Sequence, residues 1–246
     1  MWAPDKVGNL IKASNGSTDK AVIAIPGFFS ATSVKFTLDK WSEALRNAGC
    51  KDTIYVFAWN SGDLFNLIQG ILPKLVLLKN FGLSLLGVLL RIKIEAERVI
   101  KNAKSQSHEF AADVIGLSQY FSRMSVYSYS FGTRVYYYSC KYLPNEIFEN
   151  AVTLAGASEV TWKFWGAASK KAKKHINVYS KNDMVLKMIY KMPALGVGRD
   201  PIGLRAIKRR GVINRDLTKY ISGHLDYLPN SKHWYKERWY KPKLKS

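Results

Sequence analysis

The amino-acid sequence predicts an α/β protein with a mostly parallel central sheet and helices on both faces. Short apolar runs alternate along the chain with segments of helical spacing, the pattern of a parallel sheet covered on both sides. The chain has 246 residues, of which 47% are hydrophobic and 23% charged. This length and composition suit one domain with a substantial core, and no internal repeat or low-complexity linker divides it. We therefore expect a single domain over residues 1–246.

The expected elements follow one another in a regular order. Strands are predicted at 21–25, 54–59, 124–129, 151–154, 176–179 and 211–217. Helices are predicted at 34–48 and 109–121, where apolar residues recur every three or four positions. A further helix follows the strand at 124–129 directly and runs to about residue 142. Pro26-Gly27 ends the first strand, and Gly49 ends the first helix.

The junction after the strand at 124–129 carries the first chemical signal. It reads Ser-Tyr-Ser-Phe-Gly and leads from strand to helix with almost no loop. This fits the nucleophile elbow of an α/β hydrolase, G-x-S-x-G, in which a serine stands on a sharp, strained turn. Ser130 would be the nucleophile, with Ser128 and Gly132 as the small elbow residues on either side. Ser128 stands where glycine is usual, and the pattern alone also fits an ordinary strand-to-helix turn.

An acid and a histidine follow in the chain order that α/β hydrolases use. Asp183 comes just after the strand at 176–179, where this class places the acid that orients the histidine. An aspartate there could equally cap the next helix. His224 lies in a turn after the last strand and is the predicted base. The other histidines fit this order less well; they are His108, His175 and His233.

Asp226 is a second candidate for the acid, because it lies two residues after His224. Neighbours on one short turn seldom point at each other correctly, so Asp183 is preferred. The predicted oxyanion hole comes from the amides of Phe28 and Phe131, the second beside a helix amino terminus that favours negative charge. The segment Pro26-Gly27-Phe28 also fits an ordinary Pro-Gly turn.

Five segments between residues 22 and 227 carry a family resemblance. They read A-I-P-G-F, Y-S-Y-S-F-G-T-R-V, L-A-G-A-S, Y-S-K-N-D-M-V-L and D-L-T-x-x-I-S-G-H-L-D-Y. Together they resemble the hydrolase-like domain of the transmembrane and coiled-coil domain-containing protein family. The resemblance implies an α/β-hydrolase fold, a membrane-associated insert after the second strand, and Ser130, Asp183 and His224 as the triad. The sequence departs from the family in Ser128 and in lacking a long membrane-spanning region.

An apolar stretch at 64–90 stands in place of that region, within a helical, lid-like insert at about 62–104. Lys74 and Lys79 interrupt the stretch, and the uncharged pieces are too short to span a bilayer. Pro73 is expected to separate two helices. A lid, a membrane anchor and a helix pair buried in the core all fit this pattern.

The formal net charge of +20 favours an anionic partner. Basic residues cluster at 170–174 and 208–210 and in a basic, aromatic tail at about 229–246. Such a tail suits an anionic membrane surface. It also suits nucleic acid, but no base-recognition motif is present, so specific nucleic-acid recognition is not expected. The sequence leaves open whether the chain has a protein partner.

The two cysteines, Cys50 and Cys140, belong to no CxxC motif or Cys/His cluster. A disulfide framework and a metal site are therefore not expected. The amino terminus lacks the layout of a cleavable secretory signal. These features predict a cytoplasmic or peripheral membrane protein, and export by a route without a cleavable signal stays open.

The sequence thus favours a serine esterase or lipase of lipid metabolism that needs no cofactor. Phospholipid, or another lipid ester at an anionic membrane surface, is the expected substrate. The alternative is a catalytically silent hydrolase-fold module that binds membranes or a partner. A third hypothesis is a nucleic-acid binder that merely has this fold.

Overall fold

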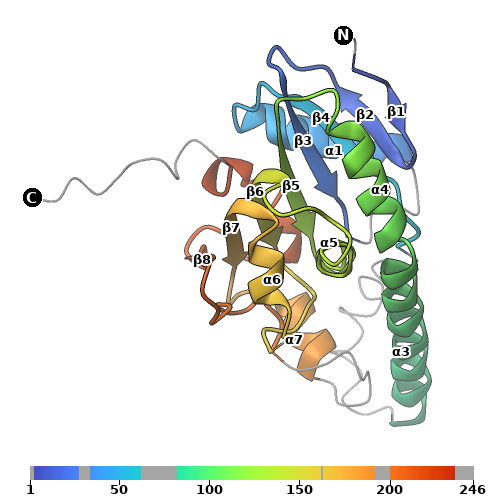
Figure 1. The fold of residues 1–246 in the computed structure, drawn as a ribbon. Coiled ribbons are helices and arrows are strands. Elements are labelled where there is room, and N and C mark those ends of the chain that lie inside the picture. The colour runs from blue at the N-terminus through green and yellow to red at the C-terminus, as the bar shows by residue number, and fades with distance from the viewer. Residues whose placement is uncertain (1–2, 28–33, 62–81, 162, 192–199, 236–246) are drawn as a thin grey trace, which may run out of the picture.

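A computed structural model describes residues 3–27, 34–61, 82–161, 163–191 and 200–235. These residues form one eight-stranded sheet with helices on both faces (Figure 1). The α/β class and the mostly parallel sheet predicted from the sequence are confirmed. Together the strands and helices enclose a core of apolar side chains that runs through both faces of the sheet.

The strand order in the sheet is β1-β2-β4-β3-β5-β6-β7-β8. In this order, every pair of neighbouring strands from β4 to β8 is parallel. At the other edge of the sheet, β1 pairs with β2 and β2 pairs with β4 in antiparallel orientation. The strands are β1 (Lys6–Val7), β2 (Leu10–Ser14), β3 (Lys20–Ile25), β4 (Thr53–Phe57), β5 (Arg123–Tyr129), β6 (Phe148–Leu154), β7 (Ala172–Tyr179) and β8 (Val212–Asp216).

The helices cover the two faces of this sheet. Figure 1 shows α4, α5 and α6 in front of the sheet and α1 behind it. The helical elements are α1 (Val34–Asn47), α3 (Gly82–Ser105), α4 (Ser107–Leu117), α5 (Gly132–Ser139), α6 (Trp165–Ser169) and α7 (Met184–Lys191), with short 3₁₀ turns η4 (His224–Asp226) and η5 (Ser231–His233).

All six predicted strands are present, as β3 to β8. The strand predicted at 54–59 is β4, which begins one residue earlier and ends at Phe57. The helix predicted to run to about residue 142 ends at Ser139, shortly before Pro144. The helix predicted at 109–121 is α4, which begins and ends a few residues earlier. The edge strands β1 and β2 and the short helices α6 and α7 were not predicted.

The insert predicted at about 62–104 is described only from residue 82, where α3 begins. Residues 64–81, including Pro73, lie outside the described residues. In the second half of α3, Ala96, Val99 and Ala103 are fully buried against the core. Leu90 and Ile94, earlier in the helix, are both more than half exposed. Within the described segments, no helix is long and apolar enough to cross a membrane.

The sheet has a topological switch point between β3 and β5. These two strands are parallel neighbours, but the chain leaves β3 towards β4 on one side and β5 towards β6 on the other. The connections therefore diverge at the carboxyl ends of the two strands, and this is where open α/β sheets form a crevice. Gly27 follows β3 and Ser130 follows β5, so the predicted site lies at this point.

The packing of α3 gives a stability prediction. Val99→Asn should lower the free energy of unfolding by about 2–4 kcal/mol, because it replaces buried methyl groups with an amide in an apolar environment. Lys101→Gln, on an exposed position of the same helix, should change it by less than about 0.5 kcal/mol. Urea denaturation measures both. Equal stability of the two variants would show that α3 does not pack on the core.

Candidate active site

Ser130 stands on a strained turn between a strand and a helix. It follows β5 directly, and its φ angle of +53° is unusual for a residue other than glycine. The end of β6 holds this conformation. The amide of Ser130 donates to the carbonyl of Leu154 at 3.0 Å, and the amide of Ala157 donates to the carbonyl of Ser130 at 3.0 Å.

The residue two positions after Ser130 must be small. A Cβ atom on Gly132 would lie 2.4 Å from the carbonyl oxygen of Ile25 and 2.6 Å from that of Pro26. Ser128 is buried, and its hydroxyl donates to the carbonyl of Val152 at 3.4 Å. The turn after β5 therefore packs against the end of β3 with no room for a larger residue at position 132.

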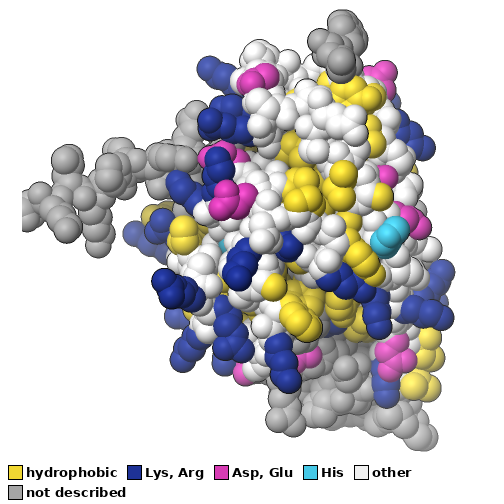
Figure 2. Space-filling view, viewed as in Figure 1, with side chains coloured by type: hydrophobic (Ala, Val, Ile, Leu, Met, Phe, Trp, Pro, Cys, Tyr) yellow, Lys and Arg dark blue, Asp and Glu magenta, His cyan; other side chains and the backbone are white. Residues whose placement is uncertain are grey.

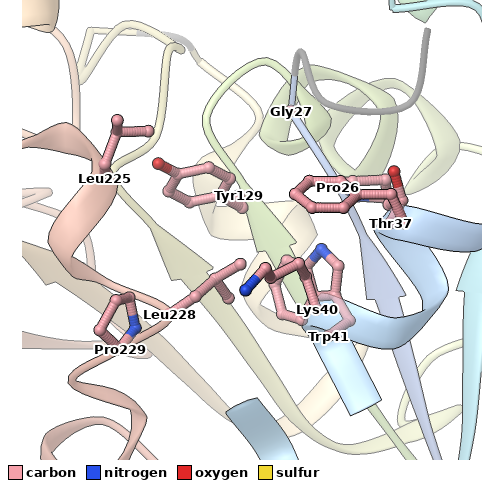
Figure 3. Close-up of a pocket in the computed structure, with 10 residues that line it drawn as sticks. Pro26, Gly27, Thr37, Lys40, Trp41, Tyr129, Leu225, Leu228 and Pro229 are labelled. Carbon is pink, nitrogen blue, oxygen red and sulfur yellow. The ribbon is translucent and has the colours of Figure 1, made fainter. Parts of the chain in front are cut away.

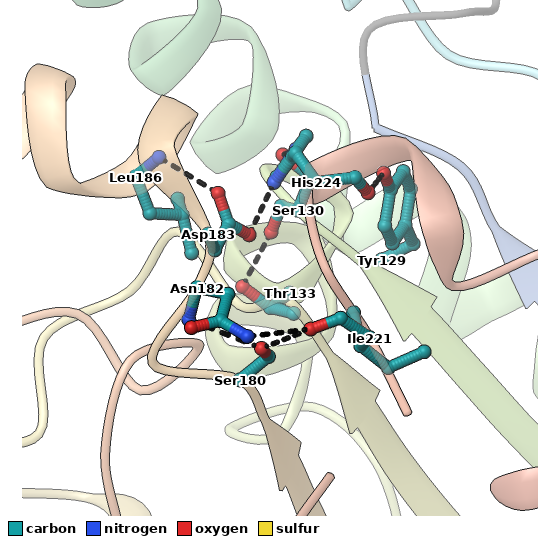
Figure 4. Close-up of polar contacts among 9 residues, drawn as sticks. All are labelled: Tyr129, Ser130, Thr133, Ser180, Asn182, Asp183, Leu186, Ile221 and His224. Carbon is teal, nitrogen blue, oxygen red and sulfur yellow. Dashed lines mark hydrogen bonds and ion pairs between the residues drawn. The ribbon is translucent and has the colours of Figure 1, made fainter. Parts of the chain in front are cut away.

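His224 links Ser130 to Asp183. Its Nε2 atom lies 3.0 Å from the Ser130 hydroxyl oxygen, and its Nδ1 atom lies 2.6 Å from Oδ2 of Asp183 (Figure 4). All three side chains are buried. A carboxylate at Nδ1 favours a proton on that nitrogen, and Nε2 is then left as a hydrogen-bond acceptor for the serine.

Asp183 combines both roles that its sequence context allowed. Its Oδ1 atom accepts a hydrogen bond from the amide of Leu186 at 2.9 Å and so caps α7, while Oδ2 faces His224. Asp226 does not take this place. Its carboxylate accepts hydrogen bonds from the amide of Ser222, at 3.0 Å, and from the Ser222 hydroxyl, which closes its own turn.

Hydrogen bonds join the loop that carries Asp183 to the segment that precedes the histidine. The hydroxyl of Ser180 donates to the carbonyl of Ile221 at 2.7 Å. The side-chain amide of Asn182 donates to the carbonyl of Thr218 at 3.1 Å and to that of Ile221 at 3.4 Å. Figure 4 shows the bonds to Ile221 beneath the pair of Asp183 and the histidine. They fix the separation of two segments that are far apart in the sequence.

Tyr129 fixes the other side of His224. Its hydroxyl donates to the backbone carbonyl of His224, and its ring centroid lies 5.2 Å from that of the imidazole. Burial, together with the nearby charge of Asp183, raises the pKa of Tyr129 well above its usual value of 10. The phenol therefore stays protonated near neutral pH and keeps donating to the histidine backbone.

The turn after β3 approaches Ser130 closely. A Cβ atom on Gly27 would lie 2.7 Å from Cβ of Ser130. The indole nitrogen of Trp59 donates to the carbonyl of Pro26 at 2.8 Å and holds this turn in place. Phe131, one of the two predicted oxyanion donors, is buried immediately before α5. Phe28, the other one, lies outside the described residues.

An apolar pocket of about 200 Å³ adjoins this site, between α1 and the segment at 225–229 (Figure 3). It reaches Gly27 and Tyr129, the neighbours of Ser130, and Leu225, the neighbour of His224. Its lining consists of Pro26, Gly27, Phe36, Thr37, Lys40, Trp41, Tyr129, Leu225, Leu228 and Pro229. An apolar pocket next to a buried serine and histidine offers a place for an apolar part of a ligand.

The other three histidines lie in structural settings. His108 meets the ring of Tyr142 edge-on, and His233 stacks on Tyr220. His175 is fully buried between aromatic rings, and neither of its ring nitrogens has a hydrogen-bond partner among the described residues. Burial lowers the pKa of His175 to about 4, so it is neutral at pH 7.

Sequence reasoning missed the residues that hold the site together. Tyr129, Trp59 and Ser180 act through contacts with distant segments, and no local pattern identified them. The pocket lining from α1 was likewise missed. For metal ions, the described part of the chain contains no group of three or more His, Cys, Asp or Glu side chains that could hold one.

The basic clusters at 170–174 and 208–210 lie at the opposite ends of the strands from the candidate site. They lie at the amino ends of β7 and β8, which pair in parallel with His175 opposite Val212. Ser130 lies at the carboxyl end of β5. Figure 2 shows many Lys and Arg side chains on the visible face of the molecule. Most of the tail predicted at 229–246 lies outside the described residues.

Comparison with known proteins places the chain in a family. The family model described as "Protein of unknown function (DUF726)" matches residues 98–237. The chain belongs to this family. The matched interval contains Ser130, Asp183 and His224, along with most of the elements that position them.

Two curated relatives match a shorter part of the chain. An uncharacterized membrane protein, C6F6.13c, of Schizosaccharomyces pombe is 34% identical over 110 residues, which are 42% of this chain and 14% of that protein. The transmembrane and coiled-coil domain-containing protein STS1 of Oryza sativa subsp. japonica is 32% identical over 111 residues, 43% of this chain and 16% of that protein. The aligned region thus spans about a seventh of the relatives' length. The predicted resemblance to transmembrane and coiled-coil domain-containing proteins agrees with the second name.

The close approach at Gly27 gives a prediction about the site. Gly27→Ala should lower the free energy of unfolding by about 1–3 kcal/mol, because the added methyl group would overlap Cβ of Ser130. Gly166→Ala is the matched control. A Cβ atom there meets nothing within 4 Å, and the position is helical, so stability should stay the same or rise slightly. Thermal unfolding measures both. A Gly27→Ala variant as stable as wild type would contradict this packing.

Proposed function

We propose that the chain is a serine hydrolase of the α/β-hydrolase class that cleaves carboxylic esters. One observation carries the proposal: the buried series of Ser130, His224 and Asp183, with hydrogen-bond distances of 3.0 and 2.6 Å. Three further features support it. The serine has a positive φ angle, it stands between a strand and a helix, and it lies at the switch point of a parallel sheet.

The proposed reaction is acyl transfer in two steps. His224 takes the proton from the Ser130 hydroxyl, and the serine oxygen attacks the ester carbonyl carbon. Asp183 stabilises the imidazolium that forms. The tetrahedral intermediate collapses when the bond to the alcohol oxygen breaks and His224 returns the proton to that oxygen. His224 then deprotonates a water molecule that attacks the acyl-enzyme, which releases the acid and restores Ser130.

Backbone amides would stabilise the oxyanion in both steps. The amide of Phe131 follows the nucleophile at the start of α5, where the helix dipole favours negative charge. The second donor in this proposal is the amide of Phe28, which is assigned from the sequence alone. Gly27 has no side chain, so the backbone before Phe28 comes close to Ser130.

The proposed substrate is a lipid ester, with phospholipid favoured. The apolar pocket beside Ser130 supports an apolar substrate, and the net charge of +20 supports an anionic one. The two relatives carry names that describe membrane proteins. A peripheral position at an anionic membrane surface fits these observations, with the protein otherwise in the cytoplasm.

One observation favours a second candidate function. Ser130 is only 1% exposed and His224 only 3%, so a substrate must displace neighbouring groups to reach them. A catalytically silent module that binds membranes or a partner through the same fold would show the same burial. Covalent labelling of the serine separates the two functions.

The nucleophile is tested with a fluorophosphonate probe and a soluble short-chain ester. Wild type should be labelled and should hydrolyse the ester, and Ser130→Ala should lose both while it keeps its fold. Ser128→Ala should keep most activity, because Ser128 contributes only a small buried side chain. Labelling that survives in Ser130→Ala and disappears in Ser128→Ala would assign the nucleophile to position 128. An unlabelled wild type would favour the silent module.

The two roles of Asp183 can be separated by comparing two substitutions. Asp183→Asn should keep the cap on α7 and most of the stability, since asparagine is as good a cap as aspartate. Its ester hydrolysis should fall by about 10³–10⁴-fold, because an amide does not stabilise the imidazolium. Asp183→Ala should lose the same activity and also about 1 kcal/mol of stability. Hydrolysis in Asp183→Asn within twofold of wild type would remove Asp183 from the mechanism.

A further inference from the structure

The pocket beside Ser130 is built for a single apolar chain. Trp41 and Tyr129 form its buried inner wall, and Phe36 and Leu225 are about two-fifths exposed at its rim. Its volume of about 200 Å³ lies below the range of roughly 300–1,000 Å³ that is usual for ligand pockets. One alkyl chain therefore suits it better than a whole two-chain lipid.

Lys40 is the single charged side chain among the described residues that line this pocket. It lies one helical turn after Phe36, and its ammonium nitrogen is 5.7 Å from the centroid of that ring. Figure 3 shows this nitrogen on the pocket side of α1, near Leu228. Among the described residues that line the pocket there is no carboxylate, so an anionic group placed here would meet the positive charge of Lys40.

A second pocket, a groove of about 140 Å³, shares Lys40, Leu228 and Pro229 with the first. Glu43 lies in this groove, and its Oε2 atom is 3.7 Å from the Lys40 nitrogen. Both side chains are more than half exposed, at 53% and 62%. Exposed pairs of this kind contribute little, so a ligand anion can replace Glu43 as the partner of Lys40 at small cost.

We propose that this pocket binds an anionic amphiphile, with its alkyl chain between α1 and the segment at 225–229 and its anionic group on Lys40. This inference rests on the proposed function in one respect, because it makes the esters cleaved at Ser130 lipids that place one alkyl chain in this pocket and carry a negative charge. Binding itself needs no hydrolysis. Lys40 is then a residue that determines specificity, and it is separate from the groups that react.

The test is calorimetric titration of the full chain with three probes, with octyl phosphate kept below its critical micelle concentration. Octyl phosphate has both the chain and the anion, 1-octanol has the chain alone, and inorganic phosphate has the anion alone. Octyl phosphate should bind most tightly. Lys40→Gln should weaken its binding about fivefold, the effect of losing one partly exposed ion pair, and should leave 1-octanol unaffected.

Three further variants control for general charge and for the apolar wall. Lys35→Gln removes the same charge from an exposed position of α1 outside the pocket and should change octyl phosphate binding less than twofold. Glu43→Gln removes the competing carboxylate and should strengthen that binding. Leu225→Gln should weaken the binding of octyl phosphate and 1-octanol alike, because it makes the rim of the pocket polar.

The proposal is overturned if Lys40→Gln and Lys35→Gln weaken binding equally, which would be general attraction to a basic protein. It is also overturned if inorganic phosphate binds as tightly as octyl phosphate, or if octyl phosphate does not bind. Fluorophosphonate labelling of the same samples reports on the proposed function separately. Unlabelled Ser130 with intact octyl phosphate binding would reject hydrolysis and keep the pocket, and the reverse pattern would reject the pocket alone.

Discussion

The close contact between the end of β3 and the turn after β5 is the constraint on which the site depends. Gly132 lies against the carbonyls of Ile25 and Pro26, and Gly27 lies against Ser130, with no space for a Cβ atom at either glycine. The turn can pack this closely only because Ser130 adopts a positive φ angle, which hydrogen bonds to the end of β6 maintain. This conformation places the serine at the switch point between β3 and β5, where the chain connections diverge.

The histidine reaches that serine through contacts that span the sheet. Asp183 is fixed twice, by the amide of Leu186 that it caps and by the loop that Ser180 ties to Ile221. A carboxylate held in this way places His224 without freedom to rotate, and Tyr129 restrains the backbone of the same histidine. The same carboxylate of Asp183 therefore caps α7 and orients the histidine. A substitution can separate these two roles only if it preserves the cap.

Local patterns in the sequence were enough to predict the sheet from β3 to β8 and to bring Ser130, Asp183 and His224 forward as candidates. The buried parallel strands are short apolar runs, which can be recognised in the sequence without knowing which strands pair with them. The edge strands β1 and β2 have few buried residues and so lack this signal. The role of Trp59 and the pocket between α1 and Leu225 depend on contacts between segments that are distant in the sequence. The spacing of residues along the chain does not predict such contacts.

The position of the positive charge matters more for function than its total. The clusters at 170–174 and 208–210 lie at the amino ends of β7 and β8, whereas the buried Ser130 lies at the carboxyl end of β5. Charges separated by the length of a strand are largely screened from each other in physiological salt, where the Debye length is about 8 Å. These clusters can draw the protein to an anionic surface, but they do not select what enters the pocket. In the proposed binding mode, that selection falls to the pocket that reaches Gly27 and Tyr129, where Lys40 lies among apolar side chains.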